Sequence, residues 1–309
     1  MSSSPVQIGR GPKAFQHRRL PPQCVRPPGV RPPLQRLERL MRGLGLHTVC
    51  EEARCPNRPE CWPRRAVTFM LLGDVCTRAC RFCAVATGKP SPPDPAEPGR
   101  VARAVSDLSI SHVVLTSVSR DELPDGGSQH FARTILAIRR ARAEASVEAL
   151  TPDFRGDLSA VSNVCRMGPD VYNHNVETVP RLYRRVRPGA DFQRSLAVLA
   201  EAKRLRPDSI VKSGLMVGLG ETMGEVNLVL RALRGVGVDT VTVGQYLRPS
   251  RDHLEVECYW EPREFQEIAA HGRALGFSHV ASGPLIRSSY NAEEILGAIR
   301  EDREALRRP

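Results

Sequence analysis

The chain has 309 residues, of which 41% are hydrophobic, which is enough for one large α/β domain with a buried core and terminal extensions. No run of eighteen or more uninterrupted apolar residues occurs, so we expect a soluble protein without a membrane span. The formal net charge of +11 favours acidic partners, and because aromatic residues make up only 5%, an acidic protein fits at least as well as nucleic acid, although most of the arginines are expected to form a solvated surface.

The chain begins with a basic, proline-rich arm over residues 1 to about 33, in which no acidic residue precedes Glu38. Its prolines oppose the amphipathic helix of an organelle transit peptide, and an apolar signal segment is lacking. Apolar residues at helical spacing then predict a helix over residues 34–45. We therefore treat residues 1–45 as one unit and expect the bacterial cytoplasm, with an organelle matrix as the alternative.

Two cysteine triads follow, which together hold six of the nine cysteines, at spacings typical of metal ligands rather than of disulfides. The first triad is Cys50, Cys55 and Cys61, at CxxxxCxxxxxC spacing. The second is tighter, a CxxxCxxC triad of Cys76, Cys80 and Cys83. Three thiolates on one loop can bind three irons of a 4Fe–4S cube and leave the fourth iron without a protein ligand. The alternative is structural zinc, which two groups of three fit poorly because zinc normally takes four ligands.

Apolar runs and helical patterns alternate through the rest of the chain. The runs predict six strands, over residues 67–72, 113–118, 147–150, 171–176, 210–217 and 241–247. Helical patterns cover residues 101–108, 131–144, 192–205 and 225–233. Strands separated by helix-length segments indicate an α/β fold with a parallel sheet. Six strands are too few for an eight-stranded barrel, so we predict a partial barrel or an open sheet, with its site at the carboxyl ends of the strands.

The CxxxCxxC triad directly follows the first predicted strand, and Phe82 places an aromatic residue before its last cysteine. This segment resembles the signature of the radical S-adenosylmethionine (SAM) superfamily. The resemblance implies that the open iron holds the methionine end of SAM, whose cleavage yields a 5′-deoxyadenosyl radical. It also implies a partial (β/α)6 parallel barrel of radical SAM type over residues 66–280, with a cysteine-rich extension at residues 46–65 and a C-terminal segment at residues 281–309.

Within this superfamily, the chain is similar to the lipoyl synthases over residues 34–290. That family has a CxxxxCxxxxxC triad before the SAM triad and an Arg-Ser-Ser-Tyr segment near its end, and both are present here. The resemblance implies that the first triad holds an auxiliary 4Fe–4S cluster, whose sulfides are the sulfur source. Its fourth ligand would be Ser289, with Ser288 as the fallback. Taken alone, the Ser-Ser pair would indicate only a helix N-cap.

Further segments resemble those that hold SAM in the superfamily, including a glycine-rich turn and an Asn-x-Glu pair after the fourth strand. The residues that the resemblance assigns to SAM are Phe82, Thr116, Ser117, Asn175, Glu177, Arg187, Lys212, Gly218 and Glu221. Asn175 and Glu177 lie two apart, so we expect both on one side of a strand. Without the cysteines, these two residues would be interpreted as a satisfied polar cluster, and Arg187 as a surface arginine.

The resemblance implies that two sulfur atoms are inserted, at carbons 6 and 8 of an octanoyl chain on a lysine of a carrier domain. Unactivated C–H bonds are too inert for side-chain acid–base catalysis, so the cofactor must carry the hard chemistry. The implied partners are octanoylated carrier domains (2-oxoacid dehydrogenase acyltransferases and the glycine cleavage H protein), a reducing ferredoxin or flavodoxin, and an iron–sulfur carrier protein.

Two other functions fit part of the pattern. One is a different radical SAM sulfur-inserting enzyme, similar to biotin synthase, which the N-terminal triad and the Arg-Ser-Ser-Tyr segment oppose. The other is a non-catalytic iron–sulfur or zinc protein that binds nucleic acid through its basic arm. That protein would show salt-sensitive binding and no cleavage of SAM, and it would leave the open iron unexplained.

Overall fold

The computed structural model describes residues 20–25, 35–290, 292–294 and 296–297 of the chain. Most of the predicted basic arm and the last twelve residues of the predicted C-terminal segment therefore lie outside the described residues. Over the ranges that are described, no helix is both long enough and apolar enough to cross a membrane.

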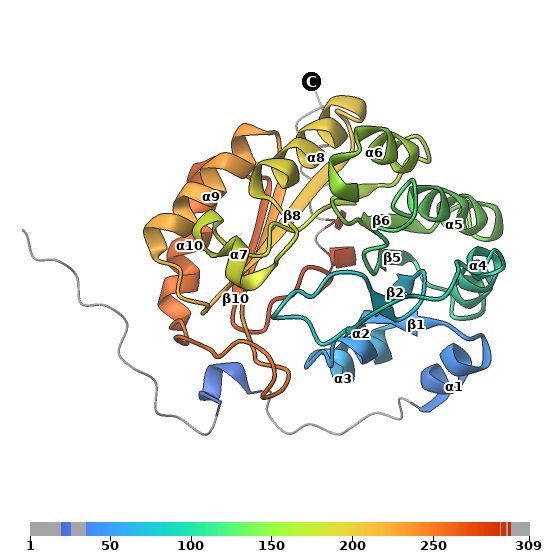
Figure 1. The fold of residues 1–309 in the computed structure, drawn as a ribbon, viewed down its shortest axis with the longest axis horizontal. Helices are drawn as coiled ribbons and strands as arrows, with labels where there is room; N and C mark the ends of the chain where they lie inside the picture. The colour runs from blue at the N-terminus through green and yellow to red at the C-terminus, as the bar shows by residue number, and fades with distance from the viewer. Residues whose placement is uncertain (1–19, 26–34, 291, 295, 298–309) are drawn as a thin grey trace, which may run out of the picture.

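The centre of the molecule is an eight-stranded sheet in the order β1-β2-β5-β6-β7-β8-β9-β10, with helices around its outer face (Figure 1). Strand β1 (His47–Thr48) runs antiparallel to β2, and every later pair in the order is parallel. The parallel strands are β2 (Thr68–Leu71), β5 (His112–Ser117), β6 (Ser146–Leu150), β7 (Val171–Asn173), β8 (Ile210–Val217), β9 (Thr240–Gln245) and β10 (His279–Gly283). The predicted α/β fold with a parallel sheet is confirmed.

The chain leaves the carboxyl end of each parallel strand in a loop. Most of these loops lead into a helix on the outside of the sheet. The outer helices are α4 (Glu97–Asp107), α5 (Ser128–Ala141), α6 (Leu158–Cys165), α8 (Phe192–Leu205), α9 (Met223–Gly235) and α10 (Pro262–Ala274). Local sequence fixes where they begin: Asp191 accepts a hydrogen bond from the Arg194 amide at 2.8 Å before α8, and Thr222 and Glu225 form a capping box on α9.

All six predicted strands are present, and the structure adds a seventh parallel strand, β10, beside β9. Its sequence, His-Val-Ala-Ser-Gly, has neither an apolar run nor a clear alternation, so sequence periodicity missed it. Strand β7 is shorter than predicted, since it ends at Asn173. The backbone of Glu177 has φ of 64°, so Asn175 and Glu177 lie in a turn beyond the strand. The two residues therefore lie outside β7, although the Asn175 side chain hydrogen-bonds the Glu177 carboxyl group, so both do lie on one side as expected.

The sheet curls until its two edges approach each other. Among the described residues, β1 and β10 form no ladder, yet the segments that follow them are in contact. The Asn57 side-chain amide donates to the Leu285 carbonyl at 2.8 Å, and the Tyr290 hydroxyl donates to Glu60 at 2.7 Å. Side chains rather than strand pairing join the edges, which gives the predicted partial barrel.

The concave interior holds a buried ion pair. The Lys212 ammonium of β8 donates to the Glu148 carboxylate of β6 at 3.0 and 3.1 Å, and each residue is 1% exposed. Burial alone would raise the pKa of Glu148, but Lys212 and a hydrogen bond from Asn173 on β7 help to lower it to about 2. Below this pair, Leu296 packs on Val171 and Ile210 and covers the amino-terminal end of the interior.

Replacing Lys212 by Met should destabilise the protein strongly, because it leaves the Glu148 carboxylate buried without its cation. We expect a loss of about 3–5 kcal/mol in the free energy of unfolding, measured by denaturant titration. Adding Glu148→Gln to Lys212→Met should restore part of the loss, because the buried charge is then gone. Arg204→Met, which breaks an exposed pair with Glu201 on α8, is the control and should change stability little. An equal effect of both single variants would contradict the interpretation.

Candidate active site

The tight cysteine triad lies on the loop that leaves the carboxyl end of β2. Cys76 ends the short strand β3 (Val75–Cys76), which pairs with β4 (Ala86–Thr87) and closes the loop on itself. The Cys83 amide donates to the Cys80 carbonyl at 3.1 Å, so the last two cysteines share one turn. The predicted position of the triad, at the carboxyl end of the first parallel strand, is confirmed.

A buried arginine between the cysteines fixes this loop. The Arg78 guanidinium makes two hydrogen bonds to Asp121, at 2.7 and 2.8 Å, and a third to Asp153 at 2.6 Å. Its side chain is 6% exposed and that of Asp153 is fully buried. Burial alone would raise the pKa of Asp153, but its interactions with Arg78 help to lower it to about 2. Asp121 follows β5 and Asp153 follows β6, so the arginine joins the cysteine loop to two neighbouring strands.

Backbone contacts fasten the loop on its other side. The Arg81 amide donates to the Val186 carbonyl at 2.8 Å, at the end of helix α7 (Tyr183–Val186). The His253 ring contacts the Cys83 carbonyl through Nε2 at 2.9 Å. Loops that follow four different strands therefore hold the triad in one place.

The thiols of this triad fit a metal cluster better than a reactive free cysteine. Burial raises the pKa of Cys80 to about 11, against the opposing effect of Arg187, and burial raises that of Cys83 to about 12. These thiols stay protonated at neutral pH unless a bound cation displaces the proton. Thiols that are inert until they meet a cation suit a site for iron.

The turn after β7 lies beside these thiols. Arg187 donates through Nη1 to the carbonyls of Asn175 and Val176 at 2.9 and 3.1 Å, and its guanidinium lies over the Tyr183 ring at 5.4 Å. Arg187 therefore shapes this turn and is buried rather than a surface residue. Burial raises the pKa of Glu177, with Arg187 opposing the shift.

Three of the predicted SAM contacts have internal partners. Lys212 is bound to Glu148, and Arg187 is bound to backbone carbonyls. The Glu221 carboxylate accepts from the amides of Gly218 and, at 3.0 Å, of Leu219, so it caps its own turn. Gly218 has φ of 107° and lies against the Gln245 side chain, and both features require glycine.

The remaining predicted contacts are buried or half-buried. Thr116 and Ser117 end β5, and Phe82 is half-buried between two cysteines. The Oγ of Ser117 and the Oδ1 of Asn175 are buried and have no hydrogen-bond partner within the described ranges. Because buried oxygens are normally satisfied, both fit a site that binds a polar ligand such as SAM.

The wider triad is built on short helices at the β2 edge. The N-terminal part comprises α1 (Gln35–Gly43), β1, α2 (Val49–Glu52) and α3 (Arg58–Cys61). Thr48 caps α2 by accepting from the Glu51 amide at 3.3 Å, which places Cys50 on its first turn. Cys61 ends α3, and the Cys55 amide donates back to the Cys50 carbonyl at 3.1 Å. Burial raises the pKa of Cys50, so this thiol also fits a cation.

The Arg-Ser-Ser-Tyr segment lies between the two triads. The residue before this segment, Ile286, lies against Gly244 of β9. A Cβ atom at Gly244 would overlap the Ile286 carbonyl. The Ser288 hydroxyl accepts from the Asn175 side chain at 3.3 Å, and Tyr290 reaches Glu60 on α3. Ser289 therefore lies between a contact to the turn after β7 and a contact to the wider triad.

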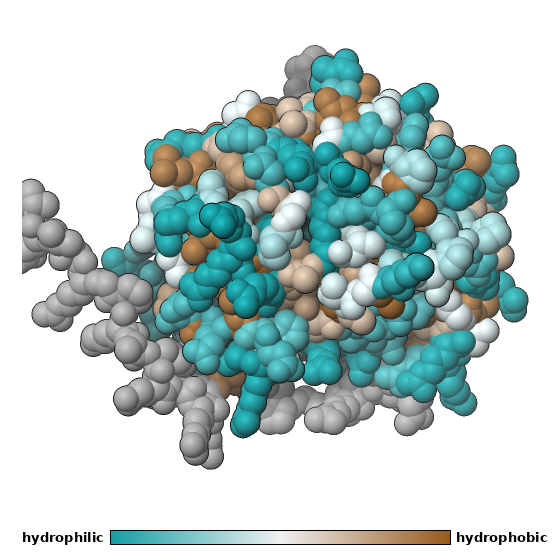
Figure 2. All heavy atoms as spheres, in the orientation of Figure 1, coloured by the Kyte–Doolittle hydropathy of each residue, from teal (hydrophilic) through white to brown (hydrophobic). Residues whose placement is uncertain are grey.

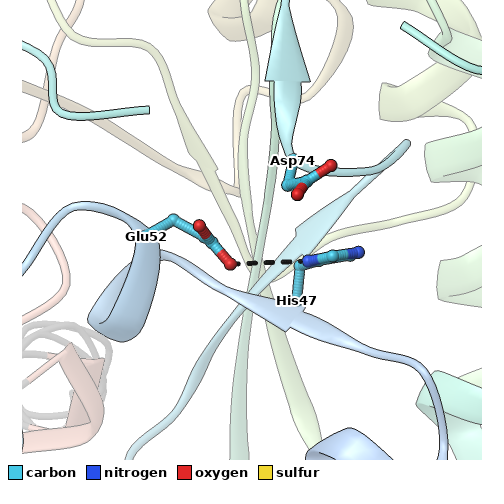
Figure 3. A group of neighbouring side chains, drawn as sticks. All are labelled: His47, Glu52 and Asp74. Atoms are coloured by element: carbon cyan, nitrogen blue, oxygen red, sulfur yellow. Dashed lines mark hydrogen bonds and ion pairs between the residues drawn. The ribbon is translucent and has the colours of Figure 1, made fainter. Parts of the chain in front are cut away.

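The ligand geometry argues against preformed zinc sites. The ligand atoms of one tetrahedral zinc lie about 4 Å apart, given Zn–S bonds of about 2.3 Å. Across the described part of the chain, the one group of three His, Cys, Asp or Glu ligand atoms within 4.8 Å of one another is His47, Glu52 and Asp74 (Figure 3). Neither cysteine triad is so compact, which suits a larger cluster.

Comparisons with known proteins agree with this geometry. The model of the radical SAM superfamily matches residues 70–244. The lipoyl synthase of Rubrobacter xylanophilus is 56% identical over 263 residues, which are 85% of this chain and 82% of that protein. The chain belongs to the lipoyl synthase family. The lipoyl synthase of Methylococcus capsulatus is 55% identical over 84% of this chain and 81% of its own length, so membership of this family decides against the biotin synthase-like alternative.

Solved structures show the same fold at low identity. Methylornithine synthase (PylB) aligns with a TM-score of 0.52 at 15% identity, over 76% of this chain and 80% of its own. Streptococcus suis SuiB bound to S-adenosylmethionine aligns with a TM-score of 0.55 at 10% identity, over 72% of this chain and 52% of its own. The predicted radical SAM fold of this lipoyl synthase family member is therefore confirmed.

Sequence reasoning missed the residues that position the site. Arg78 stands between two cysteines of the tight triad, and this position is the one signal that marks it. Asp153 and His253 carry no local signal, because they reach the triad only through the fold.

Replacing Arg78 by Met should loosen the cysteine loop, because three hydrogen bonds are lost and Asp153 keeps the Arg155 amide at 3.1 Å and Arg194 at 3.3 Å. We expect amide hydrogen exchange of residues 76–87 to accelerate at least about tenfold, which corresponds to about 1.4 kcal/mol of local stability. The measurement is mass-spectrometric exchange on anaerobically prepared protein. Arg155→Met, which removes an exposed bond to the Asp121 carbonyl, should leave that rate unchanged. Similar rates in both variants would refute the role of Arg78.

Proposed function

We propose that this protein is a lipoyl synthase that inserts two sulfur atoms, at carbons 6 and 8, into an octanoyl group carried on a lysine of a lipoyl carrier domain. The observation that carries the proposal is one chain of contacts at the carboxyl end of the sheet. It runs from the CxxxCxxC loop to Val186, from the next residue, Arg187, to Asn175, and from Asn175 to Ser288. Two residues further on, Tyr290 bonds to Glu60, next to Cys61 of the wider triad. Family membership at 56% identity supports the same reaction.

Cys76, Cys80 and Cys83 would hold the SAM-binding 4Fe–4S cluster. Together with SAM, this cluster supplies the radical that removes hydrogen from an unactivated carbon. The role of the chain is to hold the loop rigid through Arg78 and to limit the access of water, since Cys80 and Cys83 are half-buried. Asn175, Ser117, Thr116 and Phe82 would contact SAM directly, as would Gly218 through its backbone.

Cys50, Cys55 and Cys61 would hold the auxiliary 4Fe–4S cluster, which supplies the sulfur atoms. We assign its fourth ligand to Ser289, because the Ser288 hydroxyl is already bonded to Asn175. An oxygen ligand binds soft iron more weakly than a thiolate does, which suits a cluster that gives up its sulfides. In our division of the chain, residues 46–65 carry this triad, the barrel extends from residue 66 through β10, and the remainder carries Ser289.

Lys212, Glu221 and Arg187 would position the site without touching SAM, whereas Glu177 would contact it. Arg187 holds the turn that presents Asn175, and Glu221 holds the turn at Gly218. Lys212 neutralises Glu148 below the site. Glu177 lies near Cys80 and Cys83, where its carboxyl group would meet the aminoacyl end or the ribose of SAM.

The carrier domains would be those of 2-oxoacid dehydrogenase acyltransferases and the glycine cleavage H protein. Electrons would come from a reduced ferredoxin or flavodoxin, and an iron–sulfur carrier protein would rebuild the auxiliary cluster. We propose the reducing cytoplasm as the compartment, because the two cysteine triads have the spacing of metal ligands rather than of disulfides.

The function is tested on anaerobically reconstituted protein with SAM, a strong reductant and an octanoyl-lysyl peptide. We expect the peptide to gain two sulfurs and lose two hydrogens, with 5′-deoxyadenosine formed alongside, both followed by mass spectrometry. Cys50→Ala should abolish the sulfur gain and keep some 5′-deoxyadenosine, because it affects only the auxiliary cluster. Deoxyadenosine without sulfur transfer would move the substrate elsewhere, and neither product from protein with both clusters would refute the enzyme assignment.

The choice between the two serines is tested separately. Ser289→Ala should lower the iron retained by the auxiliary triad after gel filtration, because the fourth ligand is lost. Ser288→Ala is the matched control and should leave the iron content near that of the parent protein. The Mössbauer spectrum of a variant in which Cys76, Cys80 and Cys83 are all Ala isolates the auxiliary cluster for this comparison. Greater loss of iron in Ser288→Ala would reverse the assignment.

A further inference from the structure

Three surface segments meet beside the CxxxCxxC loop. They cover residues 76–89, 181–189 and 248–257, and backbone hydrogen bonds join them. The Arg81 amide donates to the Val186 carbonyl at 2.8 Å, and the Leu254 amide donates to the Arg81 carbonyl at 3.1 Å. These segments therefore form one continuous rim, which lies around α7 on a largely hydrophilic face (Figures 1 and 2).

The rim is strongly basic. Its three segments contain nine basic and three acidic residues. Two of these acids are engaged within the rim, because Arg185 pairs with Glu257 and Arg248 pairs with Glu255. The third, Asp252, accepts a hydrogen bond from Ser250 at 3.3 Å.

Three arginines of the rim remain available. Arg81, Arg184 and Arg251 are exposed, and within the described ranges none has a carboxylate within 4.0 Å, although most of the other rim arginines do. Like charges on one rim repel one another, so the arrangement costs stability in the free protein. Such a cost is recovered when a partner supplies the missing carboxylates, each of which can accept two hydrogen bonds from one guanidinium.

We infer that Arg81, Arg184 and Arg251 form a docking surface for an acidic face of the protein domain that carries the octanoyl-lysine. The inference rests on the proposed function, since it concerns the partner of the same site. The substrate carbon lies at the end of a lysine side chain. It reaches the cysteine loop only if the domain that carries this lysine binds on the rim. Charged rims of this kind raise association rates and select the partner.

The test measures binding and turnover with octanoylated glycine cleavage H protein and with a short, uncharged octanoyl-lysyl peptide. The variant is Arg184→Glu with Arg251→Glu; Arg81 is left intact because it lies between two ligand cysteines. The matched control, Arg204→Glu with Arg263→Glu on α8 and α10, changes the net charge equally on another part of the surface. Both controls are exposed residues with helical partners.

We expect the rim variant to raise Kd and KM for the carrier domain at least about tenfold and to keep kcat/KM for the peptide within about twofold. Its affinity should also depend less on salt than that of the parent protein. The control variant should behave as the parent protein does.

An unchanged Kd for the carrier domain in the rim variant would overturn the docking surface, whatever the activity. Tighter binding of a random oligonucleotide than of the domain, lost in the rim variant, would also overturn it in favour of nucleic acid. Binding of the domain that depends on the rim, without sulfur transfer to either substrate, would support docking while the proposed reaction fails. The two proposals therefore fail separately.

Discussion

The site depends on the parallel arrangement of strands β2 and β5 to β10. This arrangement brings the carboxyl ends of all seven strands to the same end of the sheet. The residues of the candidate site are spread along the sequence from Cys50 to Tyr290. No local structure would bring them together. Curling of the sheet adds a second effect, since it brings the segments after β1 and β10 into contact. The two cysteine triads therefore belong to one region of the molecule.

Buried charge is the device that makes this region rigid. Arg78 with its two aspartates, and Lys212 with Glu148, place full charges where water is excluded. Such pairs contribute little net stability, because desolvation offsets most of the attraction. They do specify one arrangement, since a displaced loop or strand would leave a buried ion without its partner. A site that generates a radical needs such a fixed arrangement to direct it.

Much of the fold and the cysteine chemistry was predictable from sequence, since apolar periodicity and cysteine spacing are local patterns. The elements that escaped are those that lack local signals. Strand β10 consists largely of small and polar residues, and the turn at Glu177 depends on a left-handed backbone that two-residue alternation cannot reveal. The internal partners of Glu221 and Lys212 depend on which strands lie side by side. The sequence motifs predicted that these residues bind SAM. They could not show that each side chain already has a hydrogen-bond partner within the protein.

The contacts between α3 and the C-terminal segment also have a consequence for biosynthesis. Asn57 and Leu285 are 228 residues apart in the chain, so the wider triad leaves the ribosome long before the serines that lie beside it. At about 5–20 residues per second, the delay is roughly 10 to 50 seconds. During translation, the nascent chain presents these three thiols without the serine that we propose as their fourth ligand. Loading of iron into this site is therefore expected to follow synthesis of the whole chain, so that premature termination leaves the site incomplete.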